Sequence, residues 1–264
     1  MIVYGRNPVR EALRGRRARS VAQVWVIPSV AQERWLADVK TRVSSADELE
    51  RVCGSPAHQG VCAEVGGYPY VGARELLAVD SPLIVALDQV QDPQNLGSIC
   101  RTAECAGATG VVIAERRAAE VTPAACKASA GAVEHMRIAR VRNIADFLGE
   151  ARDAGCWSYG ASAPDSGDAD ERDGSGIGRG EVARVTPSKT PPTVPYTSPD
   201  YRGGVVLVLG SEGSGLRPRV AGACDQLISL PLRGRMESLG VAAAASALLY
   251  GILQSRDGML DKAP

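Results

Sequence analysis

The sequence is poor in aromatic residues and in histidine. Only 4% of its 264 residues are aromatic, with one Phe and three Trp, and it has two histidines. A nucleic-acid site with so few rings would rely less than usual on base stacking. The seven cysteines form no CxxC pair, and with two histidines they do not match the ligand spacing of a zinc site. We therefore expect no metal, and reduced thiols as in a cytosolic protein.

The sequence also lacks a long apolar run and an excess of either charge. The longest weakly polar stretch, residues 241–253, is interrupted by Ser246 and Gly251, whereas a membrane span needs about 20 apolar residues. No secretory signal is evident, so we expect a soluble cytoplasmic protein with no membrane partner. Thirty basic residues balance 30 acidic ones, which excludes a polybasic coat but allows local patches.

One such patch is predicted near the N-terminus. Residues 1–19 contain six arginines and a single acidic residue, Glu11. A guanidinium group suits bidentate contact with phosphate, so a cluster of this kind can anchor a nucleic-acid backbone. The alternative is a helix face that simply contacts water.

Residues 1–72 are expected to form a small α/β unit. Its predicted elements are helices near 7–17, near 31–41 and from residue 47, and strands at 23–28 and 61–65. The turn-forming residues 66–72 mark the end of this unit, and 73–82 are expected to be a linker.

Residues 83–264 alternate between predicted strands and helices. The apolar runs at 83–87 and 205–209 are unbroken, as expected of strands buried on both faces. This pattern predicts a mostly parallel sheet covered by helices on both sides. Residues 164–200 contain six prolines and five glycines, and we expect a flexible insert there.

Three segments of this second unit carry candidate chemistry. Residues 92–103 follow a buried strand, with Asn95 near a helix N-terminus and Arg101 in its second turn. Residues 209–216 form a glycine-rich loop, but Glu212 would repel a pyrophosphate, which argues against a dinucleotide site and favours a cationic ligand or an arginine. In residues 228–245, Ser238 precedes an alanine-rich helix. Taken singly, each segment also fits an ordinary structural role.

In this order and spacing, the three segments resemble the three motifs of the SpoU/TrmH family of RNA ribose 2′-O-methyltransferases. The resemblance covers residues 83–254 apart from the insert. It implies an α/β SPOUT domain with a deep trefoil knot that forms the S-adenosylmethionine site, and a homodimer with sites at the interface. Residues 4–13 and 58–61 resemble the L30e-like substrate-binding domain of the rRNA-directed branch, whose target is a guanosine in 23S rRNA.

The resemblance also implies roles for individual residues. The catalytic candidates are Asn95, Arg101, Glu212 and Ser238. The cofactor-binding candidates are Leu209, Gly210, Leu230, Leu232 and Leu239. The candidate RNA contacts are Arg6, Arg10, Arg14, Arg16 and Arg17. Because arginine is a poor base, Arg101 is expected to stabilise the developing oxyanion. Glu212 is expected to order its loop or an arginine, such as Arg101 of a second copy.

The third motif departs from the family pattern. The family has Ser-Leu-Asn-Val-Ser where this sequence has Ser238-Leu239-Gly240-Val241-Ala242. The missing amide and hydroxyl remove hydrogen bonds worth about 1 kcal/mol each. Activity remains the favoured interpretation. The alternatives are a non-catalytic rRNA-binding or ribosome-assembly protein, and an adenosine- or tRNA-directed methyltransferase of the same family.

Overall fold

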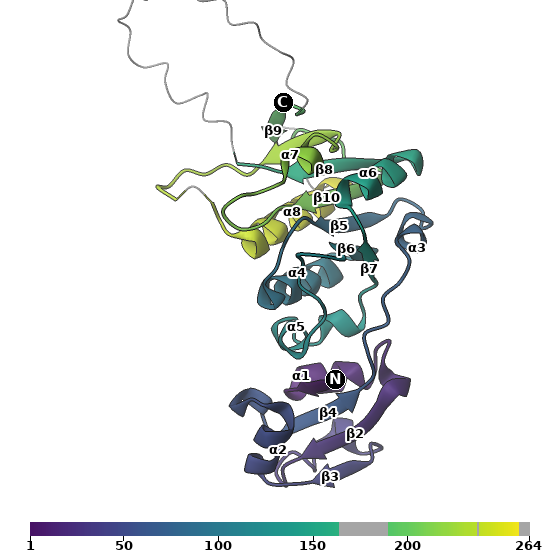
Figure 1. Ribbon diagram of the computed structural model, residues 1–264, viewed down its shortest axis with the longest axis vertical. Coiled ribbons are helices and arrows are strands. Elements are labelled where there is room, and N and C mark those ends of the chain that lie inside the picture. The colour runs from purple at the N-terminus through teal and green to yellow at the C-terminus, as the bar shows by residue number, and fades with distance from the viewer. Residues whose placement is uncertain (164–189, 237, 259–264) are drawn as a thin grey trace, which may run out of the picture.

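Two β-sheets lie one beyond the other along the long axis of the molecule (Figure 1). The computed structural model describes residues 1–163, 190–236 and 238–258. The N-terminal sheet has the strand order β1-β4-β2-β3. Its strands are β1 (Ile2–Tyr4), β2 (Val21–Val26), β3 (Thr41–Val43) and β4 (Val61–Val65). Strand β4 pairs antiparallel with β1 and β2, and β3 pairs parallel with β2.

Two helices accompany this sheet, α1 (Arg6–Ala12) and α2 (Ala46–Cys53). The Ser45 hydroxyl caps α2 by accepting from the Glu48 N–H, and Gly54 ends the helix in a left-handed conformation. The helix expected near 7–17 stops at Ala12, because the chain turns at Gly15 to pass close to Glu134.

The prediction of a helix near residues 31–41 is wrong. Residues 34–36 form a single 3₁₀ turn, η2 (Arg34–Leu36), and the chain then extends into β3. Thr41 to Val43 pair with Val24 to Val26 of β2, so strand pairing with a distant segment overrides the local helical pattern.

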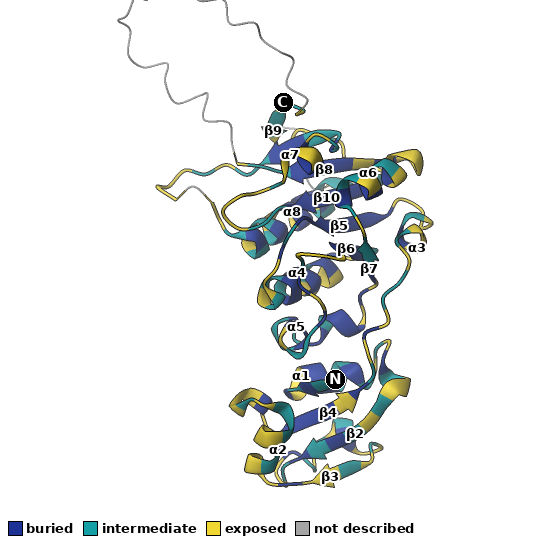
Figure 2. Ribbon diagram, viewed as in Figure 1, coloured by how far each residue is buried: buried dark blue, intermediate teal, exposed yellow. Residues whose placement is uncertain are grey.

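The C-terminal sheet confirms the parallel α/β class. Its strand order is β7-β6-β5-β10-β8-β11-β9, and every neighbouring pair is parallel. The strands are β5 (Leu83–Leu87), β6 (Gly110–Ala114), β7 (Ile138–Val141), β8 (Cys156–Ala161), β9 (Thr193–Pro195), β10 (Gly204–Leu209) and β11 (Gln226–Ser229). The central strands β5, β6 and β10 are buried almost throughout (Figure 2).

Helices cover both faces of this sheet. One face packs against α4 (Pro93–Cys105), α5 (Pro123–Ala128), the 3₁₀ turn η4 (Ala132–Glu134) and α8 (Val241–Arg256). The other packs against α3 (Ala73–Leu77), α6 (Ile144–Asp153) and α7 (Pro218–Ala221). Successive residues of β5 alternate between these two cores, which explains the unbroken apolar run.

Two expected connecting segments contain regular structure. Within 73–82, α3 buries Leu76 against the sheet. Within 164–200, β9 pairs with β11, and Gly251 of α8 leaves room for the Tyr196 ring. The expectation of a flexible insert otherwise falls on residues 164–189, which lie outside the described residues. The trefoil knot stays a prediction.

The described residues contain no helix that is long and apolar enough to cross a membrane. The same part of the chain shows no cluster of three or more His, Cys, Asp or Glu side chains that could hold a metal ion.

Candidate active site

A cavity of about 480 Å³ opens where β8, β10 and β11 end. The carboxyl edge of a parallel sheet is where α/β proteins place their ligands, and this volume suits a small organic molecule. All five cofactor-binding candidates line it, namely Leu209, Gly210, Leu230, Leu232 and Leu239. They meet because β10 and β11 end at the same edge of the sheet.

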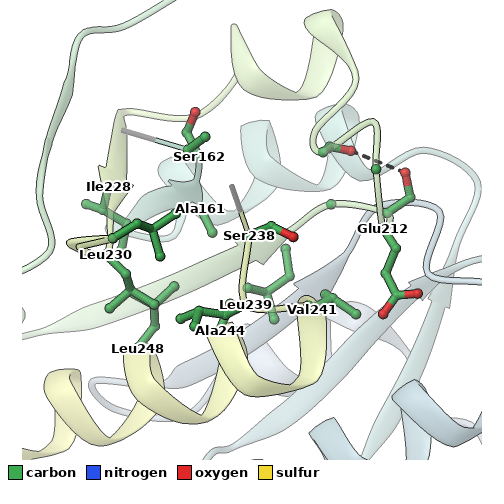
Figure 3. A pocket seen from close by; sticks show the side chains of 18 residues that line it. Ala161, Ser162, Glu212, Ile228, Leu230, Ser238, Leu239, Val241, Ala244 and Leu248 are labelled. Carbon is green, nitrogen blue, oxygen red and sulfur yellow. Dashed lines mark hydrogen bonds between the residues drawn. The ribbon is translucent and has the colours of Figure 1, made fainter. Parts of the chain in front are cut away.

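The cavity has one apolar side and one polar side. Figure 3 shows Ile228, Leu230 and Leu248 on one side, with Glu212 across from them. The apolar side chains come from β11, from the segment after it and from α8. Such a wall excludes water from an uncharged part of a ligand, while the polar rim remains open to solvent.

The glycine-rich loop is folded tightly around Gly210. A Cβ atom at Gly210 would lie 2.1 Å from the carbonyl carbon of Gly215, so only glycine fits. Backbone hydrogen bonds of 3.1 and 3.0 Å join Ser211 and Gly215 in both directions. The Ser211 and Ser214 hydroxyls lie 2.6 Å apart. The loop therefore brings bare backbone to the edge of the cavity.

A buried aspartate that the sequence did not single out anchors this loop. Asp88 follows β5 and is fully buried. Its carboxylate accepts from the backbone N–H of Arg217 at 3.0 Å and from Arg217 Nε at 2.8 Å. Arg217 directly follows the glycine-rich segment. The one sequence signal was an acidic residue at the end of a wholly apolar strand.

Three of the four catalytic candidates gather at the cavity. Glu212 and Ser238 line it. Asn95 reaches the rim from α4, where its Nδ2 donates to Glu212 Oε1 at 3.1 Å. The Asp92 side chain caps α4 by accepting from the Gln94 N–H, with Pro93 in the first turn. The capped helix thus holds Asn95 against the loop of the second motif.

The fourth catalytic candidate, Arg101, does not reach this cavity. It is exposed on α4 and does not line the pocket. Within residues 1–163, 190–236 and 238–258 the structure gives it no hydrogen bond or ion pair. The next residue along α4 is Thr102, whose Oγ1 lies 3.0 Å from Ser246 Oγ of α8. Arg101 therefore projects from the part of α4 next to the α4–α8 contact.

At Gly240, where the sequence departs from the family pattern, the backbone adopts a conformation that suits glycine. Gly240 has φ 76° and ψ 148°, a combination essentially restricted to glycine. An ideal Cβ there would lie 3.8 Å from Glu212 Oε1. Asn95 supplies the amide that contacts Glu212 in this arrangement.

The five arginines proposed as RNA contacts differ in exposure and in their ion pairs. Arg6 pairs with Glu33 at 3.0 Å, and Arg10 pairs with Glu11 at 3.0 Å. Arg14 and Arg16 are exposed. Arg6, Arg10 and Arg14 follow at intervals of four residues on and just after α1, an interval that puts helical side chains on one face.

Arg17 is placed at the contact between the two domains instead of on the surface. Its side chain is 1% exposed and pairs with Glu134 of η4, whose side chain is 0% exposed. A buried arginine with this partner has no face left for phosphate. The expected RNA contact at this residue is therefore not available in the structure.

Family models match both parts of the chain. Residues 82–250 match the SpoU rRNA Methylase family, and residues 2–71 match the RNA 2′-O ribose methyltransferase substrate-binding domain. YacO of Bacillus subtilis (strain 168), named for the TrmH family of tRNA/rRNA methyltransferases, is 37% identical over 205 residues, covering 76% of this chain and 72% of YacO. The chain belongs to the SpoU methylase family of RNA methyltransferases.

A relative with a stated target and two solved structures add to this. The 23S rRNA (guanosine-2′-O-)-methyltransferase RlmB of Acinetobacter baylyi is 32% identical over 224 residues, covering 83% of this chain and 80% of RlmB. The SpoU methyltransferase AviRb from Streptomyces viridochromogenes, solved with AdoMet, has a TM-score of 0.73 at 22% identity, covering 97% of this chain and 90% of AviRb. An AdoMet-bound rRNA methyltransferase from Sinorhizobium meliloti has a TM-score of 0.73 at 24% identity, covering 98% and 88%. These two structures share the fold.

Proposed function

We propose that this protein transfers the methyl group of S-adenosylmethionine to a ribose 2′-oxygen of RNA, and that the target is a guanosine of 23S rRNA. One observation is the main support for this active site. Asn95 contacts Glu212 across 117 residues of sequence, at the rim of the cavity that Ser238 also lines. The three motif segments therefore meet at one small-molecule cavity.

The residues present suit S-adenosylmethionine. The lack of a side chain at Gly210 lets the Ser211–Gly215 loop close tightly on it, so backbone groups can face the ligand. Leu230, Leu232 and Leu239 offer an apolar surface for the adenine ring, and Glu212 offers a carboxylate at the polar rim. The bound cofactor supplies a methyl carbon made electrophilic by a neighbouring sulfonium.

The protein's part in the reaction is positioning and charge stabilisation. The 2′-oxygen must approach in line with the bond that breaks, and it gains alkoxide character as its proton leaves. A guanidinium beside that oxygen stabilises the developing charge without acting as a base. Asn95 and Glu212 hold the loop at the rim, and Ser238 offers a hydroxyl on the same side.

A homodimer would complete this arrangement. Arg101 is exposed beside the α4–α8 contact, while the carboxylate of Glu212 is exposed at the rim. Arg101 of a second copy would find a matching negative charge there and would lie near the substrate. The dimer thus explains why a catalytic arginine stands outside the cavity of its own chain.

Ribosomal RNA is favoured over tRNA as the substrate. The match of residues 2–71 to a substrate-binding domain and the 32% identity to RlmB support this choice. The exposed arginines on and after α1 suit contact with an RNA backbone. All seven cysteines are free, in keeping with the cytoplasm as the place of reaction.

The test is tritiated-methyl transfer to rRNA from a strain in which the gene is deleted, followed by mapping of the modified nucleotide. We expect one guanosine of 23S rRNA to be labelled, and Arg101→Ala to abolish turnover while leaving cofactor affinity within about twofold. Labelling of tRNA or of an adenosine would replace the proposed target. Cofactor binding without transfer to any RNA would favour the non-catalytic rRNA-binding alternative.

A further inference from the structure

The two domains are joined by a buried ion pair as well as by the chain. Arg17 Nε donates to Glu134 Oε2 at 2.9 Å, and Arg17 Nη2 donates to Glu134 Oε1. The two side chains are 1% and 0% exposed. A bidentate pair of this kind fixes the direction of approach as well as the distance.

The remaining guanidinium N–H groups also have acceptors. Nη1 lies 3.3 Å from both the Gly66 carbonyl oxygen and Met1 Sδ, and Nη2 donates to Cys126 Sγ at 3.3 Å. Burial lowers the pKa of Arg17, but the hydrogen bond and charge of Glu134 outweigh it and raise that pKa overall. Burial raises the pKa of Cys126 to about 11, so this thiol is neutral and Glu134 supplies the balancing charge.

The backbones of the two domains approach closely beside this pair. The backbone N–H of Arg16 donates to the Glu134 carbonyl oxygen at 2.8 Å. A Cβ at Gly15 would lie 2.5 Å from that same oxygen, and one at Gly131 would lie 2.7 Å from Glu11 Cβ. Two glycines, one from each domain, therefore allow a contact that any side chain would block.

The segment between the domains is held along its length. The Tyr68 hydroxyl lies 3.0 and 2.6 Å from the carbonyl oxygens of Val133 and Met136. The Tyr70 hydroxyl accepts from the Val121 N–H at 3.0 Å. One apolar core cluster runs through both domains. Figure 1 shows α1 lying next to α5 at this contact. Residues 66–72 thus pack against the methyltransferase domain and do not form a free linker between the two units.

A buried ion pair adds little net stability, but it selects between arrangements. Any other dry packing of the two domains would bury Arg17 or Glu134 without its partner, at a cost far above that of a lost surface contact. The observed orientation is the one in which both charges are matched.

We infer that Arg17 and Glu134 are positioning residues, which hold the substrate-binding domain in one orientation so that RNA bound there presents a single ribose to the cavity. The docking is a property of the structure alone. Its consequence for the reaction rests on the proposed function.

The test uses full-length variants. Arg17→Met and Glu134→Leu each leave one buried charge unmatched, whereas the double variant replaces the pair by apolar side chains of similar size. Glu134→Gln, which keeps the shape and removes the charge, serves if Glu134→Leu does not fold. Arg42→Met is the matched control, because Arg42 and Glu48 form a pair in the same domain whose side chains are 62% and 31% exposed.

Docking is measured by small-angle X-ray scattering and by hydrogen exchange of residues 66–72. We expect each single variant to expand and to lose protection in this segment, and the double variant and the control to match wild type. Methyl transfer to rRNA from the deletion strain is measured in parallel. We expect the single variants to lower kcat/KM at least tenfold, with cofactor Kd within twofold, and the double variant to recover most of the loss.

Single variants that stay docked would overturn the inference. So would single variants that undock yet methylate the same nucleotide at the wild-type rate, or a docked double variant that does not recover. If wild-type protein transfers no methyl group, the proposed function fails and the link from docking to reaction fails with it, while scattering and exchange still decide whether the pair orients the domains.

Discussion

Replacing Gly210 by alanine should disable the proposed cofactor cavity with a single methyl group. The added Cβ would lie 2.1 Å from the Gly215 carbonyl carbon, 2.3 Å from its oxygen and 2.4 Å from the Leu216 nitrogen. Ordinary contacts between carbon atoms are about 3.5–4.0 Å. All three neighbours are backbone atoms, so no side chain can turn aside, and the loop must move by more than about 1 Å.

The size of the effect follows from what holds the loop closed. Moving Gly215 away breaks its two backbone hydrogen bonds with Ser211, each worth about 1 kcal/mol. Crowding of a packed site adds roughly 1–3 kcal/mol. A loss of about 3 kcal/mol from the binding-competent loop corresponds to about 100-fold weaker binding of S-adenosylmethionine.

Isothermal titration calorimetry with S-adenosylmethionine measures this loss directly, and circular dichroism checks that the variant is folded. Gly234→Ala is the matched control, because a Cβ at Gly234 meets nothing within 4 Å and the residue does not line the cavity. We expect its Kd to stay within about twofold of wild type. A folded Gly210→Ala protein with wild-type affinity would refute the assignment of this cavity to the cofactor.

Three further predictions concern the anchor of the glycine-rich loop, the third motif and the contact between the domains. Asp88→Asn should lower the free energy of unfolding in urea by about 2 kcal/mol, because the charge facing Arg217 is lost; an unchanged value would remove Asp88 as the anchor. Gly240→Asn should slow methyl transfer, since its φ of 76° with ψ of 148° strains other residues by about 1–3 kcal/mol; faster transfer would contradict this. Burial raises the pKa of Glu11, but hydrogen bonds from His135 and Arg10 lower it overall. Glu11 therefore stabilises docking above the ordinary glutamate pKa, and this contribution disappears as the pH falls through the lowered value. Small-angle scattering at decreasing pH should show the wild-type protein expand as Glu11 is protonated, whereas Glu11→Gln should show no such step. The same pH dependence in both proteins would contradict this.

The parallel sheet was predictable where strands are covered on both sides. Leu83 to Leu87 and Val205 to Leu209 are unbroken apolar runs because successive residues enter two different cores. Strand β8 lies among them without such a run. Its Ser158 N–H and hydroxyl bond to the Asp225 carboxylate at 2.8 and 2.6 Å, and Gly160 admits the Leu216 side chain. Partners distant in the sequence replace the apolar pattern there.

The candidate site was predictable to the extent that it sits at strand ends. Leu209 and Gly210 end β10, and Leu230 follows β11, so one sheet edge brings them together. Asp88 was missed because its partner, Arg217, is 129 residues away. No local pattern distinguishes an aspartate that closes a loop from one that faces water.

The arginine-rich N-terminus shows the same limit more sharply. Arg16 and Arg17 are adjacent and chemically identical, yet one is exposed and the other is buried against Glu134, 117 residues further on. Charge counting assigns both to RNA, whereas burial places Arg17 at the contact between the two domains. Two of the seven tyrosines, Tyr68 and Tyr70, take part in that same contact through their hydroxyl groups. Under the proposed function, the arginines left at the surface would recognise RNA through its backbone, which suits a reaction at the ribose.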